Sequence, residues 1–116
     1  MITEGFINFQ GYKIWYQVAK SAISDSPTPI LLLHGGPGLG SDYLEPLEAM
    51  AGQGRTVIRF DQLGCGRSDR PRDLSLWTIR SCMDQTDSVT TALGLDRVHL
   101  LGHSWGGMVA LGHLLF

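Results

Sequence analysis

The segment from Gly102 to Gly106, with the sequence GHSWG, carries the clearest chemical signal in this 116-residue chain. Its pattern, G-x-S-x-G, is typical of a sharp turn from a strand into a helix, which raises a serine hydroxyl above a sheet as a nucleophile. The apolar run Val98–Leu101 precedes the segment, and the apolar stretch Trp105–Phe116 follows it. This context favours a nucleophile elbow around Ser104 over an ordinary glycine-rich turn with a serine at a helix N-terminus.

A second glycine-rich turn, His34–Gly38 with the sequence HGGPG, follows the apolar run Ile30–Leu33. Glycines let the backbone come close to a substrate, and a backbone N–H at this place would point at the oxyanion that forms when a serine attacks a carbonyl. We expect the N–H groups of Gly36 and Trp105 to be the two donors of that oxyanion hole. The residues expected to support the two turns are His34, Gly35, Pro37, Gly38, Gly102, Gly106 and Asp61.

The HGGPG turn has an alternative interpretation as a phosphate-binding loop, because Asp61 ends the next apolar run, where a dinucleotide-binding fold keeps its ribose-binding acid. Two features weaken this alternative. The sequence from Gly36 to Ser41 has no small residue at the third position of a G-x-G-x-x-G pattern, and Pro37 would lie inside the loop that wraps the pyrophosphate. A P-loop is excluded because the chain has no Gly-Lys-Ser/Thr sequence. We therefore expect no cofactor.

The segment Asp61–Ser68, with the sequence DQLGCGRS, is a third glycine-rich connection, and we expect it to act as scaffolding near the site. The basic residues that follow alternate with acids, which predicts a solvated loop face; they are Arg67, Arg70 and Arg72, with Asp69 and Asp73 between them. Cys65 has no histidine near it in sequence, so it is a poor candidate for a second nucleophile. Cys65 and Cys82 form no disulfide framework, and we expect two reduced thiols.

The histidines do not have the spacing of a general base for Ser104 or of a metal site. We expect His34 to brace its own loop and the His103 side chain to point away from the serine hydroxyl. His99 lies inside a predicted strand, and His113 lies about 14 Å along a helix from the serine. The chain has no H-E-x-x-H sequence, and we expect no bound metal.

The length predicts one domain or part of a larger one, and the composition, with 43% hydrophobic and 17% charged residues, is that of a soluble globular protein. The net charge of −2, with acids and bases scattered along the chain, argues against a nucleic-acid partner. The longest apolar stretches are too short to span a membrane, and the start of the chain lacks a secretory signal. These features predict a cytoplasmic protein, and they carry no signal for an oligomeric state.

The apolar periodicity predicts a hairpin followed by alternating strands and helices. The strands are expected at Glu4–Phe9, Tyr12–Ala19, Ile30–Leu33, Thr56–Phe60 and Val98–Leu101, and the helices at Tyr43–Gln53, Leu76–Leu93 and Trp105–Phe116. The segments Lys20–Pro29 and Asp61–Ser75 are expected to be loops. Such alternation implies an α/β fold with a parallel sheet and helices on its faces.

Together, the HGGPG turn, the DQLGCGRSD segment and the GHSWGG elbow resemble the proline iminopeptidase branch of the α/β-hydrolase superfamily. The resemblance runs along the whole chain, yet the chain would cover less than half of a typical member. It implies that residues 1–116 are the N-terminal part of the fold, a βαβαβ unit after the hairpin with strand order 1-2-4-3-5. The chain would be truncated after the elbow, with the cap domain and the C-terminal strands absent. Many iminopeptidases have a small residue where His103 stands, which leaves neighbouring amidases and esterases open.

The resemblance implies a serine peptidase that releases an N-terminal residue, preferably proline, from a peptide without metal or cofactor. Ser104 would attack the carbonyl, and the amides of Gly36 and Trp105 would hold the oxyanion. The aspartate and histidine that complete the triad are not in this chain, so we expect no triad turnover from the chain alone. Two alternatives are another amidase or esterase acting on a small amide or ester, and a truncated, non-catalytic remnant. In the remnant, Val98–Leu101 would form an exposed apolar sheet edge.

Overall fold

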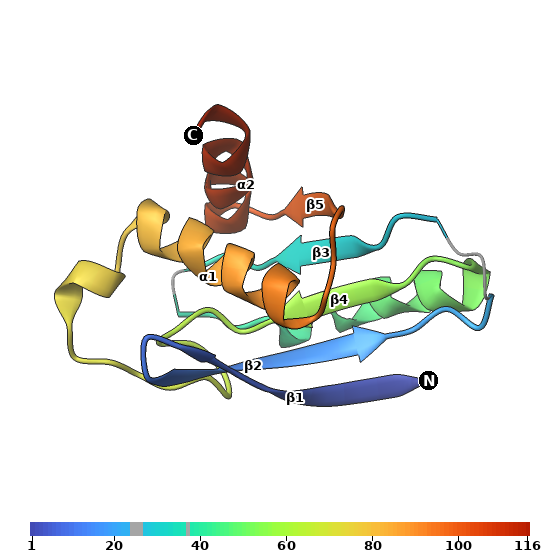
Figure 1. The fold of residues 1–116 in the computed structure, drawn as a ribbon, viewed down its shortest axis with the longest axis horizontal. Coiled ribbons are helices and arrows are strands. Elements are labelled where there is room, and N and C mark those ends of the chain that lie inside the picture. The colour runs from blue at the N-terminus through green and yellow to red at the C-terminus, as the bar shows by residue number, and fades with distance from the viewer. Residues whose placement is uncertain (24–26, 37) are drawn as a thin grey trace.

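The computed structural model describes residues 1–23, 27–36 and 38–116, and it contains a five-stranded mixed sheet (Figure 1). The strands are β1 (Ile2–Phe9), β2 (Tyr12–Ala19), β3 (Ile30–Leu33), β4 (Val57–Phe60) and β5 (His99–Gly102). Their spatial order is β1-β2-β4-β3-β5, in which β1, β2 and β4 pair antiparallel and β4, β3 and β5 pair parallel. The predicted α/β class and strand order are therefore confirmed.

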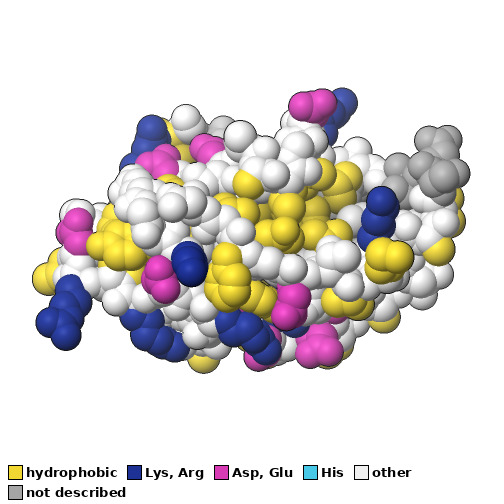
Figure 2. Space-filling view, turned by 60° about the horizontal axis from the view of Figure 1, so that its bottom comes forward, with side chains coloured by type: hydrophobic (Ala, Val, Ile, Leu, Met, Phe, Trp, Pro, Cys, Tyr) yellow, Lys and Arg dark blue, Asp and Glu magenta, His cyan; other side chains and the backbone are white. Residues whose placement is uncertain are grey.

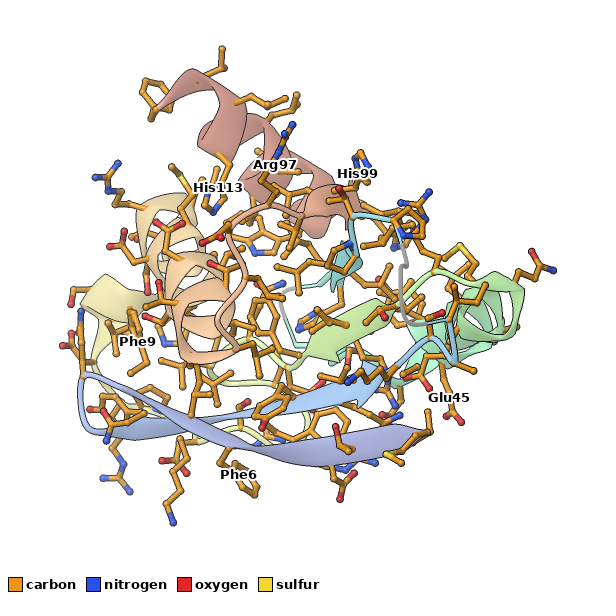
Figure 3. The ribbon with its side chains drawn as sticks, turned by 45° about the vertical axis from the view of Figure 1, so that its right-hand side comes forward. Phe6, Phe9, Glu45, Arg97, His99 and His113 are labelled. Carbon is orange, nitrogen blue, oxygen red and sulfur yellow. The ribbon has the colours of Figure 1, made fainter. Side chains whose placement is uncertain are left out.

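The hairpin of β1 and β2 closes through Gln10 and Gly11, which both have positive φ, at 51° and 88°. Two central residues of this kind match the right-handed twist of the paired strands. The side chain of Asn8 accepts a hydrogen bond from the Gly11 N–H at 3.0 Å and stabilises the turn. Alternation along β1 places Phe6 on the exposed side and Phe9 in the core beside α1 (Figure 3).

Both faces of the central strands are buried, because helices cover each of them. Alternate residues such as Leu31 and Ile58 join a core with α1 (Ile79–Ala92) and α2 (Trp105–Leu115). Their neighbours Leu32 and Val57 join a smaller core under the helix η1, Asp42–Gln53. This arrangement explains why β3 and β4 are apolar almost throughout.

The helix predicted over Tyr43–Gln53 forms as the 3-10 helix η1 and begins one residue earlier, at Asp42. Pro46 lies inside it and has no N–H to donate to a preceding carbonyl, which disfavours a regular α-helix there. Gly54 ends η1 in the left-handed conformation, with φ 96°, which glycine adopts without strain.

The helix predicted over Leu76–Leu93 is shorter, and α1 begins only at Ile79. Two capping side chains give a short 3-10 helix and α1 separate starts. Asp73 caps the short 3-10 helix η2 (Leu74–Leu76), and its carboxylate accepts from the Ser75 N–H at 3.0 Å. Thr78 then caps α1, and its hydroxyl accepts from the Ser81 N–H at 3.0 Å. Short-range hydrogen bonds of this kind set helix starts more strongly than apolar spacing does.

The predicted loop Asp61–Ser75 is more ordered than a solvated face. The guanidinium of Arg67 lies 4.4 Å from the centre of the Trp15 ring, and Arg70 donates to the carbonyl of Gly64 at 2.9 Å. The carboxylate of Asp69 accepts from the Lys13 N–H at 2.8 Å. The charged residues Arg67, Asp69, Arg70, Arg72 and Asp73 are all exposed, as the predicted solvated face requires. Three of them also bind backbone or aromatic groups from β2 or from the loop itself. The other predicted loop, Lys20–Pro29, includes residues 24–26, which lie outside the described residues.

Among the helices that the structure describes, none has both the length and the apolar character needed to cross a membrane.

Candidate active site

Ser104 lies between the end of β5 and the start of α2 in a strained backbone conformation, with φ 56° and ψ −116°. A residue other than glycine rarely adopts this conformation, and such strain is found most often at functional sites. The serine is exposed. This is the strand-turn-helix geometry in which a serine hydroxyl stands free at the carboxyl edge of a sheet.

The glycines around the elbow are required by close backbone contacts. A Cβ on Gly106 would lie 1.9 Å from the carbonyl oxygen of Leu33, and a Cβ on Gly102 would lie 2.4 Å from the carbonyl oxygen of Gly106. Since the elbow also donates from the His103 N–H to the Leu33 carbonyl at 3.1 Å, it is pressed directly against the end of β3. The HGGPG turn begins at that point.

His34, the first residue of the HGGPG turn, is fully buried. Its Nε2 accepts a hydrogen bond from the Gln62 N–H at 2.9 Å, which leaves the proton on Nδ1 to be donated to the Gly35 carbonyl at 2.7 Å. Burial lowers the pKa of His34 below its ordinary value. A neutral imidazole with both nitrogens engaged is a structural group here.

Two of the three glycines of this turn, Gly36 and Gly38, have backbone conformations that favour glycine. Gly36 has φ 128°, and a Cβ there would lie 2.6 Å from the nitrogen of Gly38. Gly38 has φ 102°, and its N–H donates to the sulfur of Cys65 at 3.3 Å. Pro37 lies outside the described residues.

Asp61 is fully buried at the end of β4, and both of its carboxylate oxygens are engaged. Oδ1 accepts from the N–H and from the hydroxyl of Ser41, each at 2.7 Å, and Oδ2 accepts from the Arg67 N–H at 2.9 Å. A Cβ on Gly66 would lie 2.2 Å from Oδ2. The carboxylate is thus enclosed by its own loops, which argues against the ribose-binding role and for a scaffolding role.

Two side chains that the sequence analysis did not single out cross-link the site. The side-chain amide of Gln62 donates to the carbonyl of His34 at 3.0 Å and accepts from the indole of Trp105 at 3.0 Å. The hydroxyl of Tyr43 lies 2.5 Å from the nitrogen of Gly35 and 2.8 Å from Nδ1 of His103. A polar residue two positions after an apolar strand was the one available signal for Gln62, and Tyr43 gave none.

Of the other candidate groups, His113 contacts a neighbouring helix and both thiols are buried. His113 on α2 contacts α1, with Nε2 3.2 Å from the carbonyl of Met83, whereas His99 lies on β5 (Figure 3). Within the described ranges, no group of three histidine, cysteine or acidic side chains is placed to hold a metal ion. Cys65 and Cys82 are free and buried, and burial raises the pKa of the Cys82 thiol to about 11. A protonated thiol is a weak nucleophile.

A hollow of about 540 Å³ lies at the opposite end of the sheet from Ser104. Its lining includes Pro29 and Thr56, which directly precede β3 and β4, with apolar side chains such as Ile58 and Leu93. Figure 2 shows apolar side chains gathered in a recessed area on this side of the molecule. Ligands of open α/β sheets bind at the carboxyl ends of the strands, so the candidate site is the Ser104 edge.

A family model described as the alpha/beta hydrolase fold matches residues 28–112 of this chain. The chain belongs to the α/β-hydrolase fold family. Its sequence is 43% identical over 110 residues to the proline iminopeptidase of Clostridium botulinum, covering 95% of this chain and 37% of that protein. It is 44% identical over 115 residues to the proline iminopeptidase of Heyndrickxia coagulans, covering 99% of this chain and 39% of that protein. This α/β hydrolase is thus proline iminopeptidase-like, and it spans less than two fifths of the length of these relatives.

Solved structures agree with this assignment. The proline iminopeptidase of Mycobacterium smegmatis superposes with a TM-score of 0.84 at 38% identity, covering 92% of this α/β hydrolase and 37% of that chain. The epoxide hydrolase VrEH1 of Vigna radiata superposes with a TM-score of 0.83 at 25% identity, covering 99% and 34% of the two chains. The same arrangement of strands therefore occurs in hydrolases with different chemistry.

Proposed function

We propose that this chain provides the nucleophile and the oxyanion hole of a serine hydrolase that releases an N-terminal proline, or another N-terminal residue, from a peptide. The observation that carries the proposal is the strained, exposed Ser104, with φ 56°, pressed against the end of β3 where the HGGPG turn begins. The identity of 43–44% to two proline iminopeptidases supports the substrate class.

In the proposed reaction, the Ser104 hydroxyl attacks the carbonyl carbon of the scissile bond, and its proton passes to a histidine acting as general base. The N–H groups of Gly36 and Trp105 donate to the oxyanion of the tetrahedral intermediate. The Trp105 N–H is suited to this role because Trp105 is the first residue of α2, and the first N–H groups of a helix have no partner within that helix.

The general base and its aspartate are proposed to come from residues that this chain does not contain. The three histidines whose ring nitrogens have partners in the described structure, His34, His103 and His113, contact groups other than the Ser104 hydroxyl. We therefore propose that the 116-residue chain alone has no triad turnover, and that the reaction needs neither metal nor cofactor. Any residual rate from an oxyanion hole without its base would be small.

The first experiment is to isolate the protein from the organism that encodes it, compare its intact mass with 12.7 kDa, and assay it on proline p-nitroanilide and on p-nitrophenyl acetate. Ser104→Ala removes the proposed nucleophile, and Ser75→Ala removes an exposed serine on η2 as a matched control. We expect Ser104-dependent hydrolysis of the prolyl amide and no effect of Ser75→Ala on that hydrolysis.

Each other outcome decides between the alternatives. Ser104-dependent cleavage of the ester without cleavage of the prolyl amide favours another amidase or esterase of this fold. A mass of 12.7 kDa without any Ser104-dependent hydrolysis supports a non-catalytic remnant and overturns the proposal. Robust Ser104-dependent turnover by the purified 116-residue chain would refute the assignment of the base to residues outside it.

A further inference from the structure

The Tyr43 hydroxyl connects the two turns of the candidate site. Tyr43 lies in the first turn of η1, its oxygen is 2.5 Å from the nitrogen of Gly35 in the HGGPG turn, and the same oxygen is 2.8 Å from Nδ1 of His103 in the elbow. Gly35 directly precedes the proposed oxyanion donor Gly36, and His103 directly precedes the proposed nucleophile. The Tyr43 hydroxyl therefore contacts the residue before Gly36 and the residue before Ser104.

The direction of these two hydrogen bonds follows from the groups that make them. The N–H of Gly35 is a donor only, so the tyrosine oxygen accepts from it. The single tyrosine proton is then available to Nδ1 of His103, and it is donated there in the imidazole tautomer whose proton lies on Nε2. Accepting one hydrogen bond makes the phenol a stronger donor in the other, so the chain from Gly35 through Tyr43 to His103 is cooperative.

The two side chains also contact each other and the backbone of the HGGPG turn, although both are exposed. The rings of Tyr43 and His103 meet edge to face, with centroids 5.4 Å apart and planes inclined by 66°. A Cβ on Gly35 would lie 3.0 Å from Nδ1 of His103 and 3.1 Å from the tyrosine oxygen. A glycine at position 35 is thus what allows the three groups to meet.

Tyr43 is itself held in place by the residues before it. The Asp42 carboxylate lies 2.9 Å from the buried guanidinium of Arg59, and the Ser41 hydroxyl donates to the buried Asp61 at 2.7 Å. Because these partners lie on β4 and at its end, the start of η1 is tied to the sheet. The tyrosine hydroxyl therefore acts from a fixed support.

We propose that Tyr43 is a positioning residue of this site, whose hydroxyl fixes the oxyanion turn relative to the nucleophile elbow. The proposal rests on the proposed function. Without the hydroxyl, the Gly35 N–H and the His103 ring lose their shared partner, and the Gly36 N–H and the Ser104 hydroxyl are free to shift relative to each other. Misplacement by about 1 Å can lower a catalytic rate by about 100-fold, and loss of an oxyanion donor has a similar effect.

The first test is NMR on the whole protein, isolated as for the activity assay, and it needs no activity. We expect the ¹⁵N shifts of His103 to report a protonated Nε2 and an unprotonated, hydrogen-bonded Nδ1. In Tyr43→Phe, the Gly35 amide and the His103 Nδ1 resonances should move, while amides of β1 and β2 stay in place. Tyr12→Phe, which removes a hydroxyl from β2, is the matched control. A His103 ring that is protonated on Nδ1 overturns the donation from Tyr43, and a ring that does not respond to Tyr43→Phe overturns the link between the two turns.

The second test is kinetic and uses the whole protein on the prolyl amide. We expect Tyr43→Phe to lower kcat by about 10- to 100-fold with little change in KM, because the lost interaction orients the transition state. His103→Asn keeps an acceptor near Nδ1 and should retain most of kcat, whereas His103→Ala should match Tyr43→Phe. The double variant Tyr43→Phe/His103→Ala should be no slower than either of its single variants, because both changes remove the same hydrogen bond. An unchanged kcat in Tyr43→Phe would contradict the positioning role of Tyr43.

The two tests separate the failure of this inference from that of the proposed function. If the whole protein shows no Ser104-dependent hydrolysis, the proposed function fails, and with it the positioning role. The NMR result still decides whether the hydrogen-bonded link exists.

Discussion

At the scale of single residues, the elbow depends on glycines that differ sharply in what surrounds them. Gly106 and Gly107 both lie in the first turn of α2. A Cβ on Gly106 would lie 1.9 Å from a backbone oxygen, which cannot move away without displacing β3, whereas the nearest atom to a Cβ on Gly107 would be 3.6 Å away, an ordinary contact. Adjacent glycines thus have opposite tolerance for a methyl group.

We predict that Gly106→Ala destabilises the chain by about 3 kcal/mol or more, because it forces the elbow away from β3. Gly107→Ala is the matched control and should be neutral or stabilise by up to about 1 kcal/mol, since alanine is the better helix former. Urea unfolding followed by tryptophan fluorescence measures both variants. Equal stability of the two variants would contradict the close-contact argument.

At the scale of elements, the buried Arg59 of β4 ties the sheet to η1. Its guanidinium is 2.6 Å from the Glu48 carboxylate and 2.9 Å from that of Asp42, and its side chain is 3% exposed. It also lies 5.0 Å from the centre of the Trp15 ring. Because Glu48 is itself 10% exposed and accepts from Gln17 at 2.9 Å, the cluster joins β2, β4 and η1.

We predict that Arg59→Met costs about 3–5 kcal/mol of stability, because it leaves the Glu48 carboxylate buried without its partner. The double variant Arg59→Met/Glu48→Leu should recover part of this loss, since no charge is then left unpaired. Arg80→Met is the control: its pair with Asp84 is exposed and 3.7 Å long, and exposed pairs contribute at most about 1 kcal/mol. Chemical unfolding that ranks Arg59→Met with Arg80→Met would refute the role of the cluster.

At the scale of the whole molecule, the chain is compact but has one uncovered apolar side. Its radius of gyration is 13.3 Å, close to the value of about 13 Å expected for a compact chain of this length. β5 is the last strand of the described sheet, and α2 beside it stands out from the rest of the molecule (Figure 1). The exposed apolar side chains of this side are Leu101, Met108, Leu111, Leu114, Leu115 and Phe116.

We predict that the purified 116-residue chain self-associates through this side at micromolar to millimolar concentrations, because unpaired strand edges and exposed apolar surface promote aggregation. Leu111→Lys should shift the chain toward the monomer in sedimentation velocity. Leu74→Lys is the control, since Leu74 is 82% exposed but lies on η2. A chain that is monomeric throughout this concentration range would contradict self-association through this side.

The sequence by itself determined the features that local patterns record. Short apolar runs located β3, β4 and β5 to within one residue, and Gln10 and Gly11 located the hairpin. The starts of η1 and α2 were also predicted to within one residue, whereas the helix expected from Leu76 begins at Ile79, because Thr78 caps it. Apolar spacing did not predict that η1 is a 3-10 helix, which has Pro46 inside it. The GHSWG and HGGPG sequences located the candidate site. Gly36 and Gly38 have positive φ, a local requirement that favours glycine, whereas Gly106 is required by its contact with β3.

Only the tertiary structure decided which side chains meet at the site. Tyr43 and His103 are 60 positions apart, and Gln62 and Trp105 are 43 positions apart, yet both pairs are hydrogen bonded. Periodicity in a sequence reports which face of an element is buried, but the partner of a polar side chain depends on strand order. Here β3 lies between β4 and β5, which brings the carboxyl ends of three strands together. That crossover creates contacts that no local pattern contains.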